Sequence, residues 1–135
     1  MISIILPSYD HLDLLDQVLR ALGSQCREAI VQKMVEIIVV DSSTLIDSKS
    51  LESKHPEVQF QFFPNKISAA KARNQGVRKS FGDTLVFLDS DCVPSEKWWA
   101  NLVALAQTDL SQARIYTGPV FYDAGASSFA RAWHL

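Results

Sequence analysis

Cysteine, glycine and proline are all scarce in this sequence, which has two cysteines, five glycines and five prolines among its 135 residues. Two cysteines, Cys26 and Cys92, cannot form the dense disulfide framework of a small secreted domain, and such a low number is typical of a reducing compartment. The low glycine and proline content excludes collagen-like and low-complexity chains, and an apolar fraction of 47% excludes an intrinsically disordered one. The composition is that of a globular domain with a substantial core.

A charge surplus and a long apolar run are also missing. The net charge is -2, so we expect no general attraction to nucleic acid or anionic lipid, and any anion site must be local. No apolar run approaches the roughly 20 residues that cross a bilayer, and Pro7 ends the short N-terminal run, which lacks the basic start of a secretory signal. We therefore expect no nucleic-acid partner, no transmembrane segment, and a cytoplasmic location, either free or peripheral at the inner face of the membrane.

Strands and helices alternate along the chain in the pattern of one α/β domain. Apolar runs predict five strands, at 2–6, 35–40, 58–62, 84–88 and 114–117. Two of them, 35–40 and 84–88, read as buried parallel strands, whereas alternating Phe and Gln at 58–62 indicate a strand near an edge. Asp10 and Asn65 are expected to cap the helices that follow them. We predict a mostly parallel, Rossmann-like sheet with helices on both faces.

Polar side chains follow three of these strands at the point where each strand ends. In an open parallel sheet, ligands bind beyond these carboxyl ends. The three segments are 7–10, 41–44 and 89–91. In an extended segment Asp89 and Asp91 would point the same way, and two carboxylates suit Mg2+ or Mn2+. The alternative is a loop acid pair, in which one carboxylate caps the next helix and the other is solvated.

Other polar side chains near this edge have both a functional and a structural interpretation. Asp41 could accept a hydrogen bond from a base or ribose, or it could stabilise a turn with the serines after it. Arg73 suits a diphosphate because its planar fork makes two parallel hydrogen bonds, whereas Lys71 is interpreted as an exposed helix cation. Tyr9 could stack on a nucleobase or serve packing.

The remaining candidate side chains carry a weaker signal. Trp98 and Trp99 are adjacent on a helix and cannot both face its core, so one is expected at the mouth of the crevice, where a sugar ring could lie against it. The histidines have no metal-ligand spacing and receive no role; they are His11, His55 and His134.

Four segments stand in order along the chain: 4–9 (IILPSY), 36–43 (EIIVVDSS), 72–76 (ARNQG) and 82–91 (GDTLVFLDSD). Together they resemble the family 2 glycosyltransferases, the large inverting group with the GT-A fold. Each motif alone is weak, but four in order are specific, and the agreement in order and spacing extends from Ile2 to about Val120.

The resemblance implies a hexosyltransferase-like enzyme that takes a nucleotide-diphosphate sugar, with UDP as the first choice, and transfers the sugar to a hydroxyl with inversion. It implies Mn2+ or Mg2+ as cofactor and a saccharide, lipid-linked or other hydroxyl acceptor. By matching position, Arg73 would reach the base or diphosphate, and Asp89 and Asp91 would serve ribose and metal. The other residues of the implied donor site are Pro7, Ser8, Tyr9, Asp41 and Ser90.

The sequence departs from the family pattern in two places. The second acid usually found after the second strand is replaced by Ser42. The inverting reaction also needs a general base, and after Glu96 the acids are Asp109 and Asp123, neither in a matching context, so the base is unassigned and Asp123 is a weak candidate. We expect 1–135 to be a single donor-binding domain, the N-terminal part of a longer protein or a unit of a homo-oligomer.

Two other functions fit parts of the same sequence. The missing base and Ser42 also fit a truncated or non-catalytic nucleotide-sugar-binding module that acts with another domain. The segment 88–93 matches the D-x-D-x-[TV] pattern of haloacid-dehalogenase-type phosphatases, in which Asp89 would be the nucleophile, although that family places the motif on its first strand.

Overall fold

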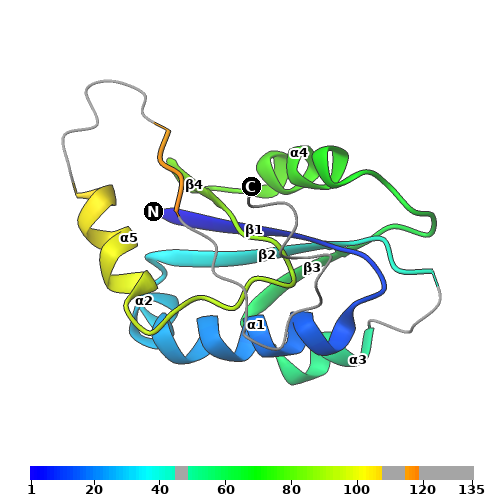
Figure 1. The fold of residues 1–135 in the computed structure, drawn as a ribbon, viewed down its shortest axis with the longest axis horizontal. Coiled ribbons are helices and arrows are strands. Elements are labelled where there is room, and N and C mark those ends of the chain that lie inside the picture. Colours follow the sequence, from blue (N-terminus) through cyan, green and yellow to red (C-terminus); the bar gives the residue numbers. More distant parts are fainter. Residues whose placement is uncertain (45–48, 108–114, 119–135) are drawn as a thin grey trace, which may run out of the picture.

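The computed structural model describes residues 1–44, 49–107 and 115–118. They build a four-stranded parallel sheet in the order β3-β2-β1-β4 (Figure 1). The strands are β1 (Ile2–Ser8), β2 (Val35–Asp41), β3 (Val58–Phe62) and β4 (Thr84–Phe87). The helices are α1 (Leu12–Gln25), α2 (Arg27–Val31), α3 (Lys49–Lys54), α4 (Ala69–Lys79) and α5 (Trp98–Ala106). The predicted α/β class is confirmed.

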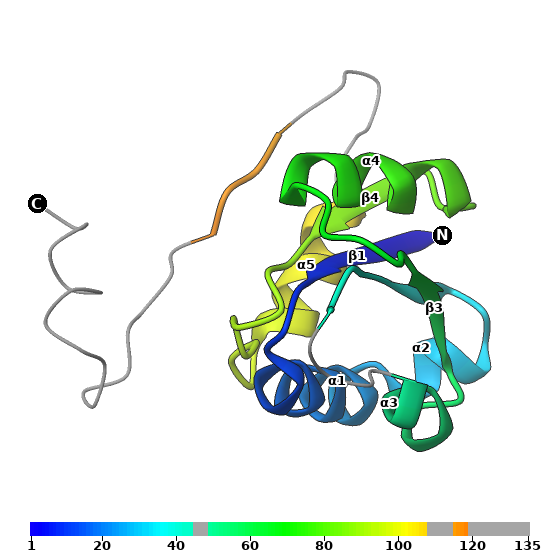
Figure 2. The ribbon, with the colours of Figure 1, turned by 90° about the vertical axis from the view of Figure 1, so that its right-hand side faces the viewer.

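Helices cover both faces of the sheet, as the sequence predicts. Figure 2 shows α4 above the sheet, with α1, α2 and α3 below it. Because strand side chains alternate between the faces, Ile4 and Leu6 pack with the leucines of α1, while Ile5 packs with Ala72 of α4. The aromatic residues of α5 join the core on the α1 side. In the described part of the chain, no helix is long and apolar enough to span a membrane.

The register between β1 and β2 brings the candidate residues level with one another. Ile2 pairs with Val35 at the start of the two strands, and Ser8 pairs with Asp41 at their end. β1 continues two residues beyond the predicted 2–6. Its pairing with β4 ends at Ile5, so at Pro7 the strand has a paired neighbour on one side only, and proline, which has no N–H, is tolerated at such a position.

Two predicted helix caps are wrong because other side chains make better bonds. α4 begins at Ala69, and its N-cap is Ser68, whose Oγ accepts from the Lys71 N–H at 3.2 Å, not Asn65. Asp10 has a φ of 52° and binds the loop after β2 instead, with its Oδ1 accepting from the Thr44 N–H at 2.9 Å. The N-cap of α1 is consequently His11, which makes no side-chain cap bond.

The prediction for the last strands is also partly wrong. Residues 115–117 are not a strand, and residue 114 lies outside the described part. β4 therefore forms an edge of the described sheet, and Leu85 and Phe87 on its α4 side are 40% and 49% exposed rather than buried. At the other edge, β3 lies where its alternating Phe and Gln residues predict.

Candidate functional site

A cleft of about 270 Å³ lies beyond the carboxyl ends of the strands, at the edge where the sequence predicts a ligand site. Its walls come from the ends of β1 and β2, the first turns of α4 and the loop after β4. The residues that line it are Pro7, Ser8, His11, Ser42, Ile67, Ala69, Ala72, Arg73, Asp89, Ser90 and Asp91. The fold thus brings together most of the predicted donor-site residues.

One residue that lines the cleft, Ser8, has a buried hydroxyl that finds no partner among the described residues. Ser8 is 4% exposed, and its Oγ makes no hydrogen bond to the described residues. Beside it, the Ser42 N–H donates to the Ser8 carbonyl at 3.0 Å. Buried polar atoms are normally satisfied, so a ligand that enters the cleft would find an available hydrogen-bonding group here.

Asp41 and Tyr9 do not line the cleft. Asp41 is 2% exposed, and its carboxylate accepts from the Ser43 Oγ at 2.7 Å and from the Ser43 N–H at 3.3 Å. This geometry matches the turn-stabilising interpretation. Tyr9 is half-buried, and the Lys66 Nζ lies 3.9 Å from the centroid of its ring, a cation–π contact.

The loops after β1 and β2 are bonded to each other, which holds this wall of the cleft. The Asp10 N–H donates to the Ser43 Oγ at 2.8 Å, and the Thr44 N–H donates to Asp10. Ser43 therefore connects Asp41 on one side with Asp10 on the other. The serines after Asp41 serve this connection between the two loops.

Arg73 reaches the cleft from α4 and pairs with Asp89. Its Nη2 donates to the Asp89 Oδ1, and both side chains are partly exposed. Arg73 can lie so close to the strand ends because its neighbour Ala72 and the next-turn Gly76 are the buried positions of this helix. Lys71 is exposed and does not line the cleft, in agreement with its interpretation as a helix cation.

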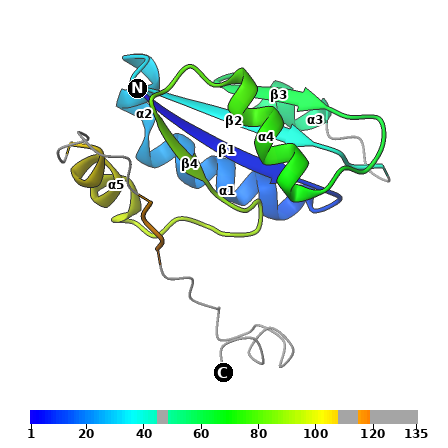
Figure 3. The ribbon, with the colours of Figure 1, turned by 90° about the horizontal axis from the view of Figure 1, so that it is seen from above.

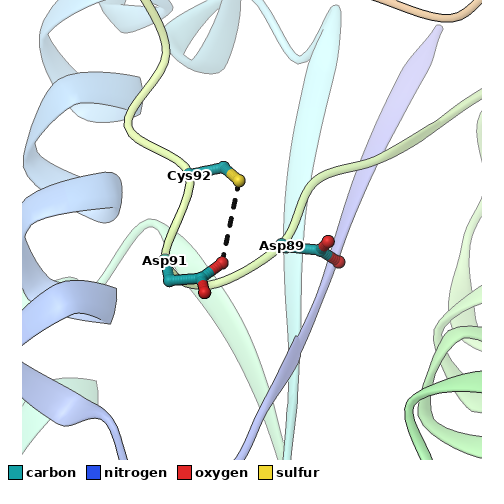
Figure 4. Close-up of side chains that lie close together, drawn as sticks. All are labelled: Asp89, Asp91 and Cys92. Carbon is teal, nitrogen blue, oxygen red and sulfur yellow. Dashed lines mark hydrogen bonds between the residues drawn. The ribbon is translucent and has the colours of Figure 1, made fainter. Parts of the chain in front are cut away.

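The loop after β4 carries a cluster of two acids and a cysteine, Asp89, Asp91 and Cys92 (Figure 4). The loop forms a turn there rather than an extended segment. The Cys92 N–H donates to the Asp89 carbonyl at 3.1 Å and closes the turn. Carboxylate oxygens of Asp89 and Asp91 and the Cys92 Sγ all lie within 4.8 Å of one another. The two carboxylates lie close together as predicted. The turn brings them together, whereas the prediction relied on the alternation of side chains in an extended segment.

Cys92 is the member of this cluster that the sequence analysis did not assign. Burial, with the nearby carboxylates of Asp91 and Asp89, raises the pKa of its thiol to about 11, so it stays protonated at neutral pH. Its Sγ donates to the Asp91 Oδ1 at 3.7 Å. A neutral thiol is a poor ligand for a hard cation, whereas the two carboxylates suit Mg2+ or Mn2+. The donor set therefore fits such an ion through its oxygens.

Some expectations are corrected here and others lie outside the described residues. His11 and Ser42 line the cleft although neither was assigned a role; their position directly after β1 and β2 was the available signal. Trp98 and Trp99 both pack against the core on the α1 side and neither lines the cleft, so the placement of one at the crevice mouth is wrong. The weak base candidate Asp123 lies outside the described part of the chain.

The comparisons with known proteins agree on one family. The model of that family, described as glycosyl transferase family 2, matches residues 3–130. The chain is 27% identical over 101 residues to the glycosyltransferase AglE of Haloferax volcanii, which covers 72% of this chain and 32% of AglE.

Solved structures resemble the chain as well. The structure of S. aureus TarS 1-349 superposes with a TM-score of 0.66 at 20% identity, covering 76% of this chain and 31% of that one. A mannosyltransferase from Pyrobaculum calidifontis, solved with GDP-Man and Mn2+, does so with a TM-score of 0.61 at 25% identity, again over 76% and 31%. The chain thus spans about a third of the length of these proteins.

Proposed function

The chain belongs to glycosyl transferase family 2, and we propose that it forms the donor-binding part of an enzyme that transfers a sugar from a nucleoside diphosphate to an acceptor hydroxyl with inversion. The observation that carries this proposal is the cleft at the strand ends, where Arg73 pairs with Asp89. Asp91 and Ser8 line the same cleft, and the Ser8 hydroxyl has no hydrogen-bond partner among the described residues. Cationic, anionic and neutral polar groups converge there on a space in which a nucleotide could lie.

The nucleoside end of the donor is assigned to the loops after β1 and β2. Pro7 and Ser8 line the cleft, and the Ser8 Oγ would take part in a hydrogen bond with the ligand. Tyr9 would offer the base the face of its ring that the Lys66 ammonium does not cover. Asp41 would act on the nucleoside through the turn that it holds with Ser43, unless that turn opens on binding.

The diphosphate end is assigned to Arg73 and the loop after β4. Arg73 is paired with Asp89; a diphosphate would give its guanidinium a second anionic partner and leave Asp89 available. Asp89 and Asp91 would hold a divalent cation, which stabilises the charge that grows on the leaving diphosphate. The related mannosyltransferase solved with GDP-Man and Mn2+ supports this assignment. Ser90, between the two acids, would contact the ribose or phosphate.

Deprotonation of the acceptor hydroxyl is assigned to a base that is not among the donor-site residues. Within the described residues, the carboxylates that line the cleft are Asp89 and Asp91, and both are occupied on the donor side. A base elsewhere, on another segment or another subunit, would complete the site. The second candidate function is a non-catalytic nucleotide-sugar-binding module, which needs the same donor cleft and no base. The phosphatase interpretation is replaced by the family assignment.

Calorimetric titration with UDP and GDP, in Mn2+ and in EDTA, tests the proposal. We expect binding of one nucleotide in Mn2+ that disappears in EDTA. Arg73→Lys should weaken it roughly tenfold, because a point charge does not replace a bidentate fork, while Lys71→Ala on the same helix should have no effect. Lack of binding by folded protein would refute the nucleotide site, and equal affinity in EDTA would refute the metal alone.

We also place the protein in a reducing, cytoplasmic compartment. Cys26 is buried and Cys92 half-buried, and both are free thiols. Burial raises the pKa of the Cys26 thiol to about 12, which makes it inert. Thiol titration of the native protein should detect Cys92 slowly and Cys26 only after unfolding.

A further inference from the structure

Three large apolar side chains are exposed on segments at the end of the sheet opposite the cleft, where the strands begin. Phe81 is 82% exposed, Val31 77% and Met34 58%. Hydrogen bonds join the segments that carry them: the Ile2 N–H donates to the Met34 carbonyl at 2.9 Å, and the Phe81 N–H donates to the Glu36 Oε1 at 2.6 Å. Exposed apolar side chains on joined segments, unlike a single exposed side chain, mark a contact surface.

Exposed cations stand among these apolar side chains. Lys33 directly precedes Met34, and Arg78 and Lys79 end α4 just before Phe81. In the part of the chain that the structure describes, none of the three forms an ion pair. We call the six residues the strand-start surface: Val31, Lys33, Met34, Arg78, Lys79 and Phe81.

Nearby carboxylates offset only part of this positive charge. Asp83 is paired with the Met1 ammonium at 2.8 Å. Glu36 accepts from the Ser3 hydroxyl at 2.6 Å and from the Phe81 N–H; because both donors are neutral, its negative charge remains and offsets one of the three cations. Glu28, at the start of α2, is adjacent to Arg27 and leaves no net charge there. A protein with a net charge of -2 therefore carries a local positive surface.

We propose that the strand-start surface docks the protein on an anionic lipid bilayer. Phe81, Met34 and Val31 would enter the headgroup region, and the basic side chains would face the lipid phosphates. The alternative occupant, a protein, is less suited because protein interfaces are depleted in lysine, and two of the three cations are Lys33 and Lys79. Lysine and arginine side chains around an aromatic residue are instead typical of segments that bind a membrane surface.

Docking in this way would leave the donor cleft open to water. Figure 3 shows the N-terminus and α2 at one end of the strands, and the loops that follow β1 and β2 at the other. The seven residues of β1 separate the two ends by about 20 Å, at roughly 3.3 Å per residue. A water-soluble nucleotide could therefore enter the cleft while the opposite end contacts lipid.

Co-sedimentation of the protein with vesicles tests the proposal. One set contains phosphatidylcholine alone, and in the other about a third of the lipid is phosphatidylglycerol. We expect binding to the anionic vesicles that is lost at high salt, and none to the neutral ones. The R78A/K79A double variant should weaken it roughly 25-fold, at about fivefold per charge, and Phe81→Ser should weaken it too.

Lys71→Glu is the matched control, because it changes the net charge by the same amount but lies two turns earlier on α4, towards the cleft. It should keep vesicle binding, and all variants should keep the thermal unfolding transition of the native protein. Absence of binding to anionic vesicles, equal binding to neutral ones, or equal losses in Lys71→Glu would overturn the proposal. A dimer in sedimentation velocity that Phe81→Ser dissociates would also overturn it, in favour of a second copy.

Discussion

Replacing Gly76 by alanine tests whether the close approach of α4 to the sheet sets the position of Arg73. At an open helix position this change would stabilise the protein by about 1 kcal/mol, because glycine is the more costly residue in a helix. Here the new Cβ would overlap the Ile5 Cγ2, and Ile5 is fully buried in a strand with neighbours on both sides. Overpacking costs about 1–3 kcal/mol, and the overlap with a fully buried side chain calls for the upper end of that range. After the helix gain of about 1 kcal/mol is subtracted, we expect a net loss of about 2 kcal/mol in the free energy of unfolding.

Gly23→Ala in α1 is the matched control. Its Cβ would lie 3.3 Å from the Glu57 Oε1, the end of a flexible side chain that can move away. This variant should gain about 0.5–1 kcal/mol. Urea unfolding at constant m-value measures both changes, and calorimetry should show weaker nucleotide binding in Gly76→Ala alone, since Arg73 moves with its helix. A Gly76→Ala protein as stable as the wild type would refute the reasoning.

Three further predictions concern the acids. Asp91→Ala should abolish the metal-dependent part of nucleotide binding and leave the Tm of the ligand-free protein unchanged or slightly raised, because one of two neighbouring carboxylates is removed; a large fall in Tm would make Asp91 a structural residue. The hydrogen bond with His55 lowers the pKa of Asp16 in the folded protein. Asp16 therefore stabilises the fold fully at a pH above its pKa in the unfolded chain, and this contribution is lost as the pH falls through its pKa in the folded protein. Asp16→Asn should therefore flatten the loss of stability below about pH 5 in urea titrations. The 135 residues alone should bind donor without transferring sugar to an acceptor; robust transfer in a product assay would contradict this and make Asp123 the first base to test.

Local patterns in the sequence are enough to predict the class of fold and the side of the sheet where the site lies. The run at 35–40 is apolar on both faces, whereas the run at 58–62 alternates between apolar and polar residues. This difference distinguishes an inner strand from an edge strand, because successive side chains point to opposite faces and each face shows in the sequence whether it is buried. The aspartates at 89 and 91 follow such a run, and strands that all run parallel must end at the same edge. These inferences need no knowledge of which strands are neighbours.

Contacts between distant segments decided the features that the sequence could not show. Asn65 and Asp10 are good caps by residue type. Asp10 instead bonds the loop at 43–44, which depends on where the chain returns in space. Ser68, not Asn65, caps α4 because the local backbone places its hydroxyl by the Lys71 N–H. Asp41 faces Ser43 rather than the cleft, and Arg73 meets Asp89 because Gly76 lets α4 settle on Ile5. Cys92 joins the acids through a turn, whereas the sequence predicts an extended segment at 89–91. In each case the free energy of a bond depends on a partner many residues away or on local backbone geometry, and residue type alone specifies neither.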